Sequence, residues 1–142
     1  MQLFIGGAGA GKHAAVSERF PTARWHRLTP GDALDAWNES LADGMILVVT
    51  GWTAWLEAAL AVERDDDRLR GRLVAALETL AVVESEAGSP VVLILPEMGR
   101  GIVPMEPELR RLRDLVGWLA QDAAARAEAV WYVRHGLIKA LK

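Results

Sequence analysis

Short runs of consecutive apolar residues recur along the chain, separated by longer segments with helical periodicity. Fully apolar runs of this length, bounded by turn residues, are typical of strands that are covered on both faces of a sheet. Arg24–Leu28 is a further candidate strand of more polar character. The apolar runs are Leu3–Ile5, Met45–Val49, Val91–Leu95 and Ala129–Val133.

The segments between these runs are predicted to be helices because apolar residues recur in them every three or four positions. Capping or breaking residues bound several of them, such as Pro21, Asp65–Asp67 and Gly88. We expect a loop from Pro96 to Pro107, and a short tail after Gly136. The predicted helices cover Lys12–Phe20, a segment from Thr29 or Asp32 to about Leu41, Trp52–Ala61, Arg68 to about Ala87 and Glu108 to about Arg126.

Strands that alternate with helices imply parallel βαβ units. The predicted fold is therefore α/β, with a mostly parallel central sheet and helices on both faces. No linker, internal repeat or low-complexity segment divides the chain. We expect one domain over residues 1–142, which is the length of an ordinary domain.

Composition excludes several classes of function. The chain has no cysteine, so it forms no disulfide, thiolate zinc site or cysteine nucleophile, which fits a reducing compartment. A net charge of −3 gives no general attraction to nucleic acid or to an anionic membrane. The apolar runs are too short to span a bilayer, and Met1–Ile5 lacks the features of a signal peptide. We expect a cytoplasmic protein with no nucleic-acid or membrane partner.

A glycine-rich segment follows the first predicted strand and precedes the first predicted helix. It reads Gly6-Gly7-Ala8-Gly9-Ala10-Gly11-Lys12, which fits the phosphate-loop pattern G-x-x-x-x-G-K. Glycines let backbone N–H groups turn around a phosphate, and the helix N-terminus adds donors and a positive dipole end. Lys12 would supply a mobile cation for the β- and γ-phosphates. The alternative is a glycine-rich turn with an incidental lysine, but four glycines in six positions favour phosphate binding.

Two positions near this loop depart from what metal-assisted phosphoryl transfer uses. His13 stands where the pattern has Ser or Thr, whose hydroxyl binds Mg²⁺; an imidazole is a poor ligand for that ion. His13 either hydrogen-bonds a phosphate or reflects drift. Thr50, rather than a carboxylate, follows Met45–Val49 and is a weak substitute as a metal ligand. The metal ligands, and whether Mg²⁺ takes part, are therefore left open by the sequence.

Glu97 follows the predicted strand Val91–Leu95 and is the best remaining acid near the carboxyl edge of the sheet. Ligands bind at that edge in parallel sheets. Arg100 lies in the glycine-rich loop beyond it, where it either contacts a phosphate as a bidentate donor or is solvated. We expect Lys12 and Glu97 to be the catalytic residues. The loop residues Gly6–Lys12, His13, Thr50 and Arg100 are the expected nucleotide-binding residues.

The segment from Pro96 to Pro104, P-E-M-G-R-G-I-V-P, resembles a known signature, N-E-V-G-x-G-I-V-P. That signature belongs to adenosylcobinamide kinase / adenosylcobinamide-phosphate guanylyltransferase, the bifunctional enzyme of late cobalamin assembly. Arg110–Gly117 resembles the family's R-R-F-R-D-x-x-G, and Val48–Leu56 resembles V-D-C-L-T-x-W-L. With Gly6–Lys12 included, the resemblance covers nearly the whole chain.

The resemblance implies a RecA-like P-loop NTPase fold, a homo-oligomer, ATP or GTP as cofactor and a corrinoid substrate. One family activity phosphorylates a hydroxyl of adenosylcobinamide, and the other transfers GMP from GTP through a guanylylated histidine. The family carries a histidine-rich and arginine-rich segment between its first helix and a later strand that contains a His-Trp pair. Here Phe20–Trp25 passes almost directly from the first helix to the matching tryptophan, Trp25, and His26 lies after it, so the guanylylated histidine has no counterpart.

We therefore expect no guanylyltransferase activity, because that step needs a covalent nucleophile. The kinase step needs only positioning and charge neutralisation, so an adenosylcobinamide kinase-like protein of cobalamin biosynthesis is the main interpretation. The alternative is a catalytically impaired nucleotide-binding or assembly protein that keeps the family scaffold. The changes at His13 and Thr50 favour this alternative.

Overall fold

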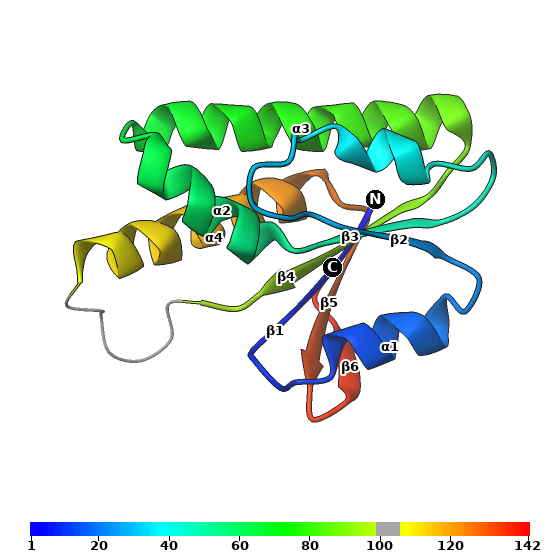
Figure 1. Ribbon diagram of the computed structural model, residues 1–142. Helices are drawn as coiled ribbons and strands as arrows, with labels where there is room; N and C mark the ends of the chain where they lie inside the picture. The colour runs from blue at the N-terminus through cyan, green and yellow to red at the C-terminus, as the bar shows by residue number, and fades with distance from the viewer. Residues whose placement is uncertain (99–105) are drawn as a thin grey trace.

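Six strands form one sheet in the order β2-β3-β4-β1-β5-β6 (Figure 1). The structure is a computed structural model that describes residues 1–98 and 106–142. All neighbouring strands run parallel except β5 and β6, which form an antiparallel pair. The predicted mostly parallel α/β fold is confirmed. The strands are β1 (Gln2–Gly6), β2 (Arg24–Arg27), β3 (Leu47–Thr50), β4 (Val91–Pro96), β5 (Ala129–Arg134) and β6 (Leu137–Ala140).

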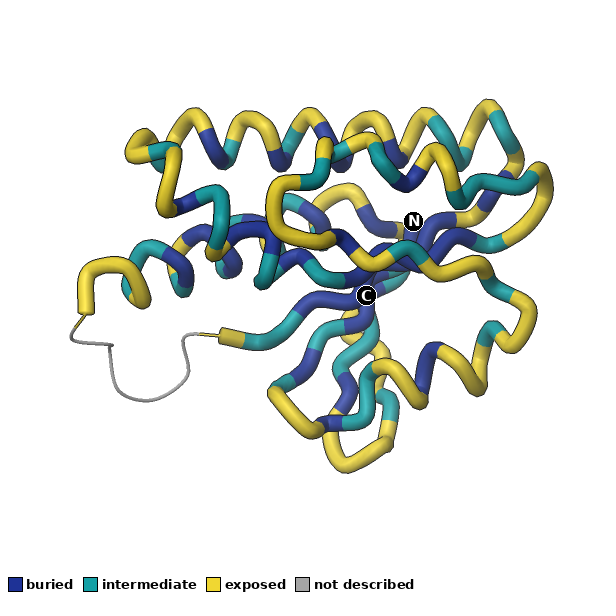
Figure 2. Tube along the Cα trace, in the orientation of Figure 1, coloured by how far each residue is buried: buried dark blue, intermediate teal, exposed yellow. Residues whose placement is uncertain are grey.

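Helices cover both faces of this sheet, as predicted. Helix α1 (Lys12–Arg19) lies on one face, and α2 (Trp52–Val62), α3 (Asp66–Ala87) and α4 (Pro107–Arg126) lie together on the other (Figure 1). Figure 2 shows buried residues gathered along the central strands and on the helix sides that face them. A short 3-10 helix, η1 (Ala36–Ser40), lies on the same side as α3.

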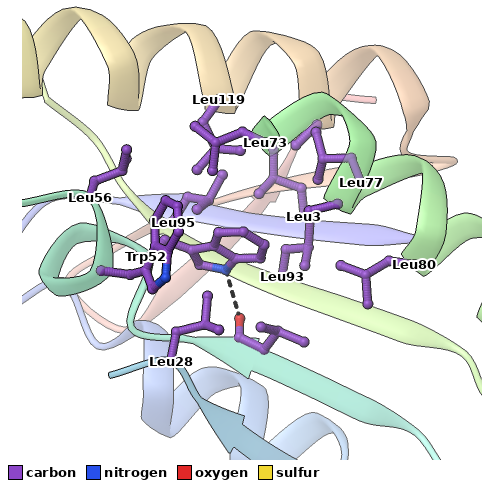
Figure 3. Packing of buried hydrophobic residues seen from close by; sticks show 14 of the residues in the cluster. Leu3, Leu28, Trp52, Leu56, Leu73, Leu77, Leu80, Leu93, Leu95 and Leu119 are labelled. Atoms are coloured by element: carbon purple, nitrogen blue, oxygen red, sulfur yellow. Dashed lines mark hydrogen bonds between the residues drawn. The ribbon is translucent and has the colours of Figure 1, made fainter. Parts of the chain in front are cut away.

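The larger hydrophobic core lies between the sheet and the three-helix layer (Figure 3). Leu3 and Leu93 point from the central strands toward Leu73 of α3 and Leu119 of α4, and each of these side chains is at most 1% exposed. Full burial of one leucine side chain stabilises the fold by about 1.5–3 kcal/mol. Trp52 is also buried, and its indole N–H donates to the Val49 carbonyl at 3.2 Å. These contacts hold the carboxyl ends of the strands, and the loops that follow them, in place.

Arg111 ties the helices of this layer to one another. Its guanidinium donates to the carbonyls of Leu60 and Glu63 at the end of α2, at 3.2 and 2.8 Å. The same group forms an ion pair with Asp66 in the first turn of α3. Arg111 belongs to the R-R-F-R-D-like segment, so at least one arginine of that segment has a structural role.

Two predicted elements were wrong. The expected helix from Thr29 or Asp32 to Leu41 is mostly loop: the Thr29 N–H donates to the Asp32 carboxylate at 2.8 Å, and Gly31 has a φ of 85°. Side chain-to-backbone bonds of this kind compete with helix formation. Only Ala36–Ser40 forms a 3-10 helix.

The second error concerns the tail after Gly136, which forms strand β6 instead. His135 and Gly136 have φ values of 53° and 73°, and they separate paired residues of β5 and β6. Two successive residues with positive φ form the type I′ turn that suits a two-residue hairpin. Within the described ranges, no helix is both long and apolar enough to cross a membrane.

Candidate phosphate-binding site

The carboxyl ends of five parallel strands meet at one edge of the sheet. The register aligns Gly6 at the end of β1 with Pro96 at the end of β4, and Arg27 of β2 with Thr50 of β3. The segment Gly7–Gly11 leaves β1 at this edge and leads directly into α1. The predicted loop residues, Thr50 and Glu97 therefore come to the same edge, as the sequence predicted.

Two glycines of this segment are required by the geometry. A Cβ atom on Gly6 would lie 2.3 Å from the Val133 carbonyl oxygen of β5, which is closer than real Cβ contacts. Gly11 is the N-cap of α1 and has a φ of 91°, in the left-handed region that L side chains rarely adopt. Glycine at these positions allows β5 to pack against the loop and the chain to turn into the helix.

The N-terminus of α1 faces this edge with unpaired backbone donors. The Ala15 N–H is the first to bond back into the helix, to the Gly11 carbonyl at 2.9 Å, so the N–H groups before it have no acceptor within the helix. Within the described residues no side chain caps α1, and its first turn holds no acidic residue. The positive end of the helix dipole and these donors form an arrangement that favours an anion.

The Lys12 ammonium is folded back onto the loop. It donates to the carbonyls of Gly6 and Gly7, both at 2.9 Å. Each carbonyl also accepts a backbone N–H, from Glu97 at 2.8 Å and from Ala10 at 3.2 Å respectively. Lys12 can therefore turn toward a phosphate without leaving either carbonyl unpaired. Burial of the ammonium lowers the pKa of Lys12, because burial disfavours the charged form. A bound anion would offset this effect.

A cavity of about 550 Å³ opens beside Lys12 on the side of β2 and β3. Its basic side chains are Lys12, His13 and Arg27, and Thr50 and Glu57 also line it. The pKa of His13 lies below its ordinary value of 6.5 because of burial first, and then because of the charges of Lys12 and Arg27. His13 is therefore a neutral imidazole at pH 7, in surroundings that are positively charged.

The His13 ring stacks on Trp25, with ring centroids 5.7 Å apart and an angle of 20° between the planes. Trp25 projects from β2 on the face that α1 covers, because it pairs with Val48 of the smaller core cluster on that face. The stack fixes the ring at the mouth of the cavity, although Trp25 itself is 37% exposed. His13 is thus held in a defined position at the loop.

Glu97 does not face this cavity. Its carboxylate accepts a hydrogen bond from the Tyr132 hydroxyl of β5 at 2.8 Å. It lines a separate cavity of about 280 Å³ on the other side of the loop, together with Arg134 and His135. The structure therefore brings Lys12, His13 and Thr50 together and places the Glu97 carboxylate against β5. Arg100 lies outside the described residues.

Three lining residues were not foreseen from the sequence: Arg27, Glu57 and Tyr132. Arg27 ends β2 at the carboxyl edge, a position that the parallel order of the strands could have indicated. Glu57 lies in α2, which follows β3, and it contributes the only carboxylate among the described residues that line the Lys12 cavity. Tyr132 pairs with Ile5 of β1, and this pairing cannot be known before β5 is placed beside β1.

The side chains beside Lys12 suit an anion better than a hard divalent cation. Mg²⁺ prefers several oxygen ligands, whereas this cavity offers two cations, an imidazole, threonine hydroxyls and one carboxylate. In the parts of the chain that the structure describes, no group of three or more His, Asp or Glu side chains is placed to hold a metal ion. The residues present therefore fit a dedicated magnesium site poorly.

Comparison with known proteins identifies the family. The model of the cobinamide kinase / cobinamide phosphate guanyltransferase family (CobU) matches residues 12–141. The bifunctional adenosylcobalamin biosynthesis protein CobP of Pseudomonas aeruginosa is 35% identical over 133 residues, which are 93% of this chain and 74% of that protein. The bifunctional adenosylcobalamin biosynthesis protein CobU of Escherichia coli is 33% identical over 75 residues, 53% of this chain and 41% of that protein. The chain therefore belongs to the cobinamide kinase / cobinamide phosphate guanyltransferase family, and its α/β fold is the P-loop NTPase-like fold that the motifs implied.

Proposed function

We propose that this chain binds ATP or GTP at Gly6–Lys12 and transfers the terminal phosphate to adenosylcobinamide, as a kinase of cobalamin biosynthesis. The observation that carries the proposal is the junction of β1 and α1, where uncapped helix donors and a movable lysine face the carboxyl edge of the sheet. The relatives are named for adenosylcobalamin biosynthesis, which supports the substrate class. We propose that the whole chain acts as one nucleotide-binding domain.

In this proposal the phosphates of the nucleotide lie over the loop and the first turn of α1. Lys12 leaves the carbonyls of Gly6 and Gly7 and donates to the β- and γ-phosphates. Arg27 reaches the same cavity from β2 and adds a second positive charge. His13, at the position of the usual metal-binding hydroxyl, donates a hydrogen bond to a phosphate oxygen in this proposal. Charge on the phosphates is therefore neutralised chiefly by protein cations, and we expect binding to depend weakly on Mg²⁺.

The cavity beside Lys12 is the proposed place of the acceptor. The hydroxyl oxygen of the acceptor attacks the γ-phosphorus, the bond from that phosphorus to the bridging oxygen breaks, and the nucleoside diphosphate leaves. The hydroxyl proton passes to a base, for which Glu57 is the carboxylate in this cavity. The base proposed here is therefore Glu57 and not Glu97, the catalytic acid that the sequence suggested, whose carboxylate accepts a hydrogen bond from the Tyr132 hydroxyl.

The guanylyltransferase step is not part of the proposal. His26, the histidine nearest in sequence to the family's tryptophan, pairs with Val49, a member of the larger core cluster. It therefore points to the face of the sheet opposite the His13–Trp25 stack. Its Nδ1 lies 3.2 Å from the Ser40 hydroxyl, and its Nε2 is buried without a hydrogen-bond partner among the described residues. A half-buried ring whose Nε2 is enclosed in this way is poorly placed to attack a nucleotide. We expect no covalent label when the protein is incubated with GTP labelled in its α-phosphate.

A second candidate function is nucleotide binding or assembly without turnover. The poor fit of the Lys12 cavity to Mg²⁺ favours it, because His13 stands where a metal-dependent kinase has a hydroxyl and Thr50 where it has a carboxylate. In this candidate function the loop still binds phosphate, but no phosphoryl group is transferred. It predicts tight nucleotide binding with no cobinamide-dependent release of diphosphate.

Calorimetric titration followed by a turnover assay separates these proposals. We expect ATP or GTP to bind with and without Mg²⁺, and adenosylcobinamide to be phosphorylated when both substrates are present. Lys12→Ala should weaken binding and abolish turnover. Lys142→Ala is a matched control, since that ammonium donates to the Ala124 carbonyl of α4 at 2.9 Å. Binding without turnover would leave the second candidate, and failure of every nucleotide to bind would overturn both.

A further inference from the structure

A second helix N-terminus opens onto the Lys12 cavity. The N-cap of α2, Gly51, and the three residues of its first turn, residues 52–54, all line this cavity. No described side chain caps α2, and its first turn holds no acidic residue. The Trp55 N–H is the first to bond back into the helix, to the Gly51 carbonyl at 3.1 Å. The three N–H groups before it therefore have no acceptor within the helix, as at the start of α1.

The start of α2 and the phosphate loop lie on either side of one strand end. The sheet order places β4 between β3 and β1. Neighbouring strands are about 4.8 Å apart, so the ends of β1 and β3 are about 10 Å apart. The chain leaves β1 into α1 on one face of the sheet and leaves β3 into α2 on the other (Figure 1). Ligands of parallel sheets bind at such an edge, and an anion at the start of α2 would lie beside the phosphates of a nucleotide at the loop.

Thr50, the residue before the N-cap of α2, supplies an unused hydroxyl at this place. Its side chain lines the Lys12 cavity, although the residue is only 5% exposed. Among the described residues, none forms a hydrogen bond with this hydroxyl. Buried polar groups in proteins are normally hydrogen-bonded, so a buried hydroxyl that faces a cavity without a partner indicates a ligand there. A hydroxyl can donate to an anion, whereas the carboxylate that metal-dependent kinases have after this strand would repel one.

Arg27 brings a positive charge to the same place. It pairs with Thr50 in the register of β2 and β3, and it lines the Lys12 cavity. A Cβ atom on Gly51 would lie 3.1 Å from the Arg27 Cγ, so the arginine side chain passes over the start of α2. Its guanidinium forms no ion pair with another described residue. A guanidinium of this kind can bind a phosphate through two parallel N–H donors.

We propose that the first turn of α2, Thr50 and Arg27 form a second anion site, the α2 site, which binds the phosphate monoester made when the acceptor hydroxyl is phosphorylated. Its backbone N–H groups, hydroxyl and guanidinium suit a tetrahedral dianion. Glu57 is the opposing charge in this cavity, beyond the first turn of α2. In the proposed step Glu57 takes the proton of the acceptor hydroxyl, so its negative charge is removed as the phosphate monoester forms. The identity of the anion rests on the proposed function, whereas the α2 site itself does not.

Calorimetric titration of the ADP-saturated protein with inorganic phosphate tests the α2 site separately from the loop. ADP occupies the loop, so we expect one phosphate to bind beside it. Absence of phosphate binding to the ADP complex would overturn the α2 site. If ADP itself does not bind, the proposed function fails, and titration of Lys12→Ala with phosphate then tests the α2 site alone. Phosphate binding should persist in that variant, and its loss would overturn the α2 site as well.

Substitutions of Thr50 locate the bound phosphate. Thr50→Val keeps the shape but lacks the hydroxyl, so it should weaken phosphate binding to the ADP complex about tenfold, the loss of one hydrogen bond to a charged group. Thr50→Ser should keep the wild-type affinity. Thr79→Val is the matched control, since the Thr79 hydroxyl donates to the Ala75 carbonyl on the exposed side of α3. An unchanged affinity in Thr50→Val would overturn the α2 site.

The affinity of nucleotides for Thr50→Val identifies the source of the anion. If the α2 site binds the phosphorylated acceptor, ADP and a non-hydrolysable ATP analogue should both bind this variant as they bind the wild type. A variant that binds ADP normally and the ATP analogue about tenfold more weakly would show that the terminal phosphate of the nucleotide occupies the α2 site. That result would overturn the assignment to the acceptor.

Discussion

The proton on His13 should be linked to the binding of anions at the loop. In the unliganded protein, burial and the charges of Lys12 and Arg27 keep the pKa of His13 below 6.5. A doubly charged anion at the loop neutralises those charges and accepts a hydrogen bond from the imidazolium, so it raises that pKa. Binding therefore takes up a proton in the pH range between the two pKa values. Affinity should be highest at low pH and should fall as the pH rises through that range.

The size of this effect has a limit set by linkage. A single titrating group changes the affinity by at most about tenfold per pH unit, or about 1.4 kcal/mol. The total gain is bounded by the strength of a charge-assisted hydrogen bond, about 1.5–3 kcal/mol net. Lys12, Arg27 and Glu57 also line the cavity. Histidine is the side chain whose ordinary pKa places its change of charge between pH 5 and 8. His13 is thus the group in this cavity expected to respond.

Sulfate is a suitable probe because its charge does not change in this pH range. Calorimetric titration between pH 5 and 8 should show affinity falling with pH, together with proton uptake revealed by buffers of different ionisation enthalpy. His13→Asn should remove the slope, and His135→Asn should keep it because His135 lies outside the Lys12 cavity. A slope that survives in His13→Asn, or a wild-type affinity independent of pH, would refute the linkage. Without an anion, the free energy of unfolding should fall as the pH falls below 6.5, because His13 takes up a proton more readily in the unfolded chain than in the folded protein.

Three further predictions concern the framework around the site. Gly6→Ala should destabilise the fold by about 2 kcal/mol in urea unfolding, since the new Cβ would lie 2.3 Å from the Val133 carbonyl oxygen, whereas Gly7→Ala has open space and should cost less than half as much. Asp65→Ala should lower the free energy of unfolding by about 1 kcal/mol in the same urea experiment, because the carboxylate accepts from two N–H groups at the start of α3. An unchanged free energy of unfolding would contradict this. Arg111→Met should cost about 2 kcal/mol by leaving two carbonyls and a carboxylate without their donor, and an unchanged melting temperature would show that water replaces it.

The fold was predictable where local patterns and long-range packing agree. The fully apolar run at Val91–Leu95 became β4, a central strand in which all of these residues are buried, because a strand covered on both faces can bury such a run. Ala129–Val133 became β5, in which Val130 and Val133 are buried. The segment after Thr29 failed because its side chain-to-backbone bond with Asp32 competes with a helix. The strand β6 escaped notice because its residues are mostly exposed and carry no alternating pattern.

The location of the site could be predicted from the sequence, but the direction in which each side chain points could not. Parallel strands place their carboxyl ends at one edge, so Lys12, Thr50 and Glu97 could be brought together from the sequence alone. Which side of the loop each side chain faces depends on strand order across the sheet. Glu97 turns to Tyr132 because β5 lies beside β1, and Arg27 reaches the Lys12 cavity because β2 lies beside β3. Neither fact is encoded locally.

Some residues at the carboxyl edge of the sheet match the family motifs, and others differ from them. Gly51, with a φ of 82°, would place a Cβ 2.3 Å from the Leu28 carbonyl oxygen, so packing alone explains a glycine after β3, just as it does at Gly6. A glycine required by packing is needed for the fold whether or not the chain turns over a substrate. His13 stacks on Trp25 and Thr50 is buried, and both also line the cavity beside Lys12. Packing and the proposed phosphate chemistry therefore both bear on these two positions. The framework glycines therefore do not distinguish binding from turnover. Whether adenosylcobinamide is turned over depends on whether Lys12 and Arg27 can neutralise the charge of the phosphates without a metal ion held by the protein.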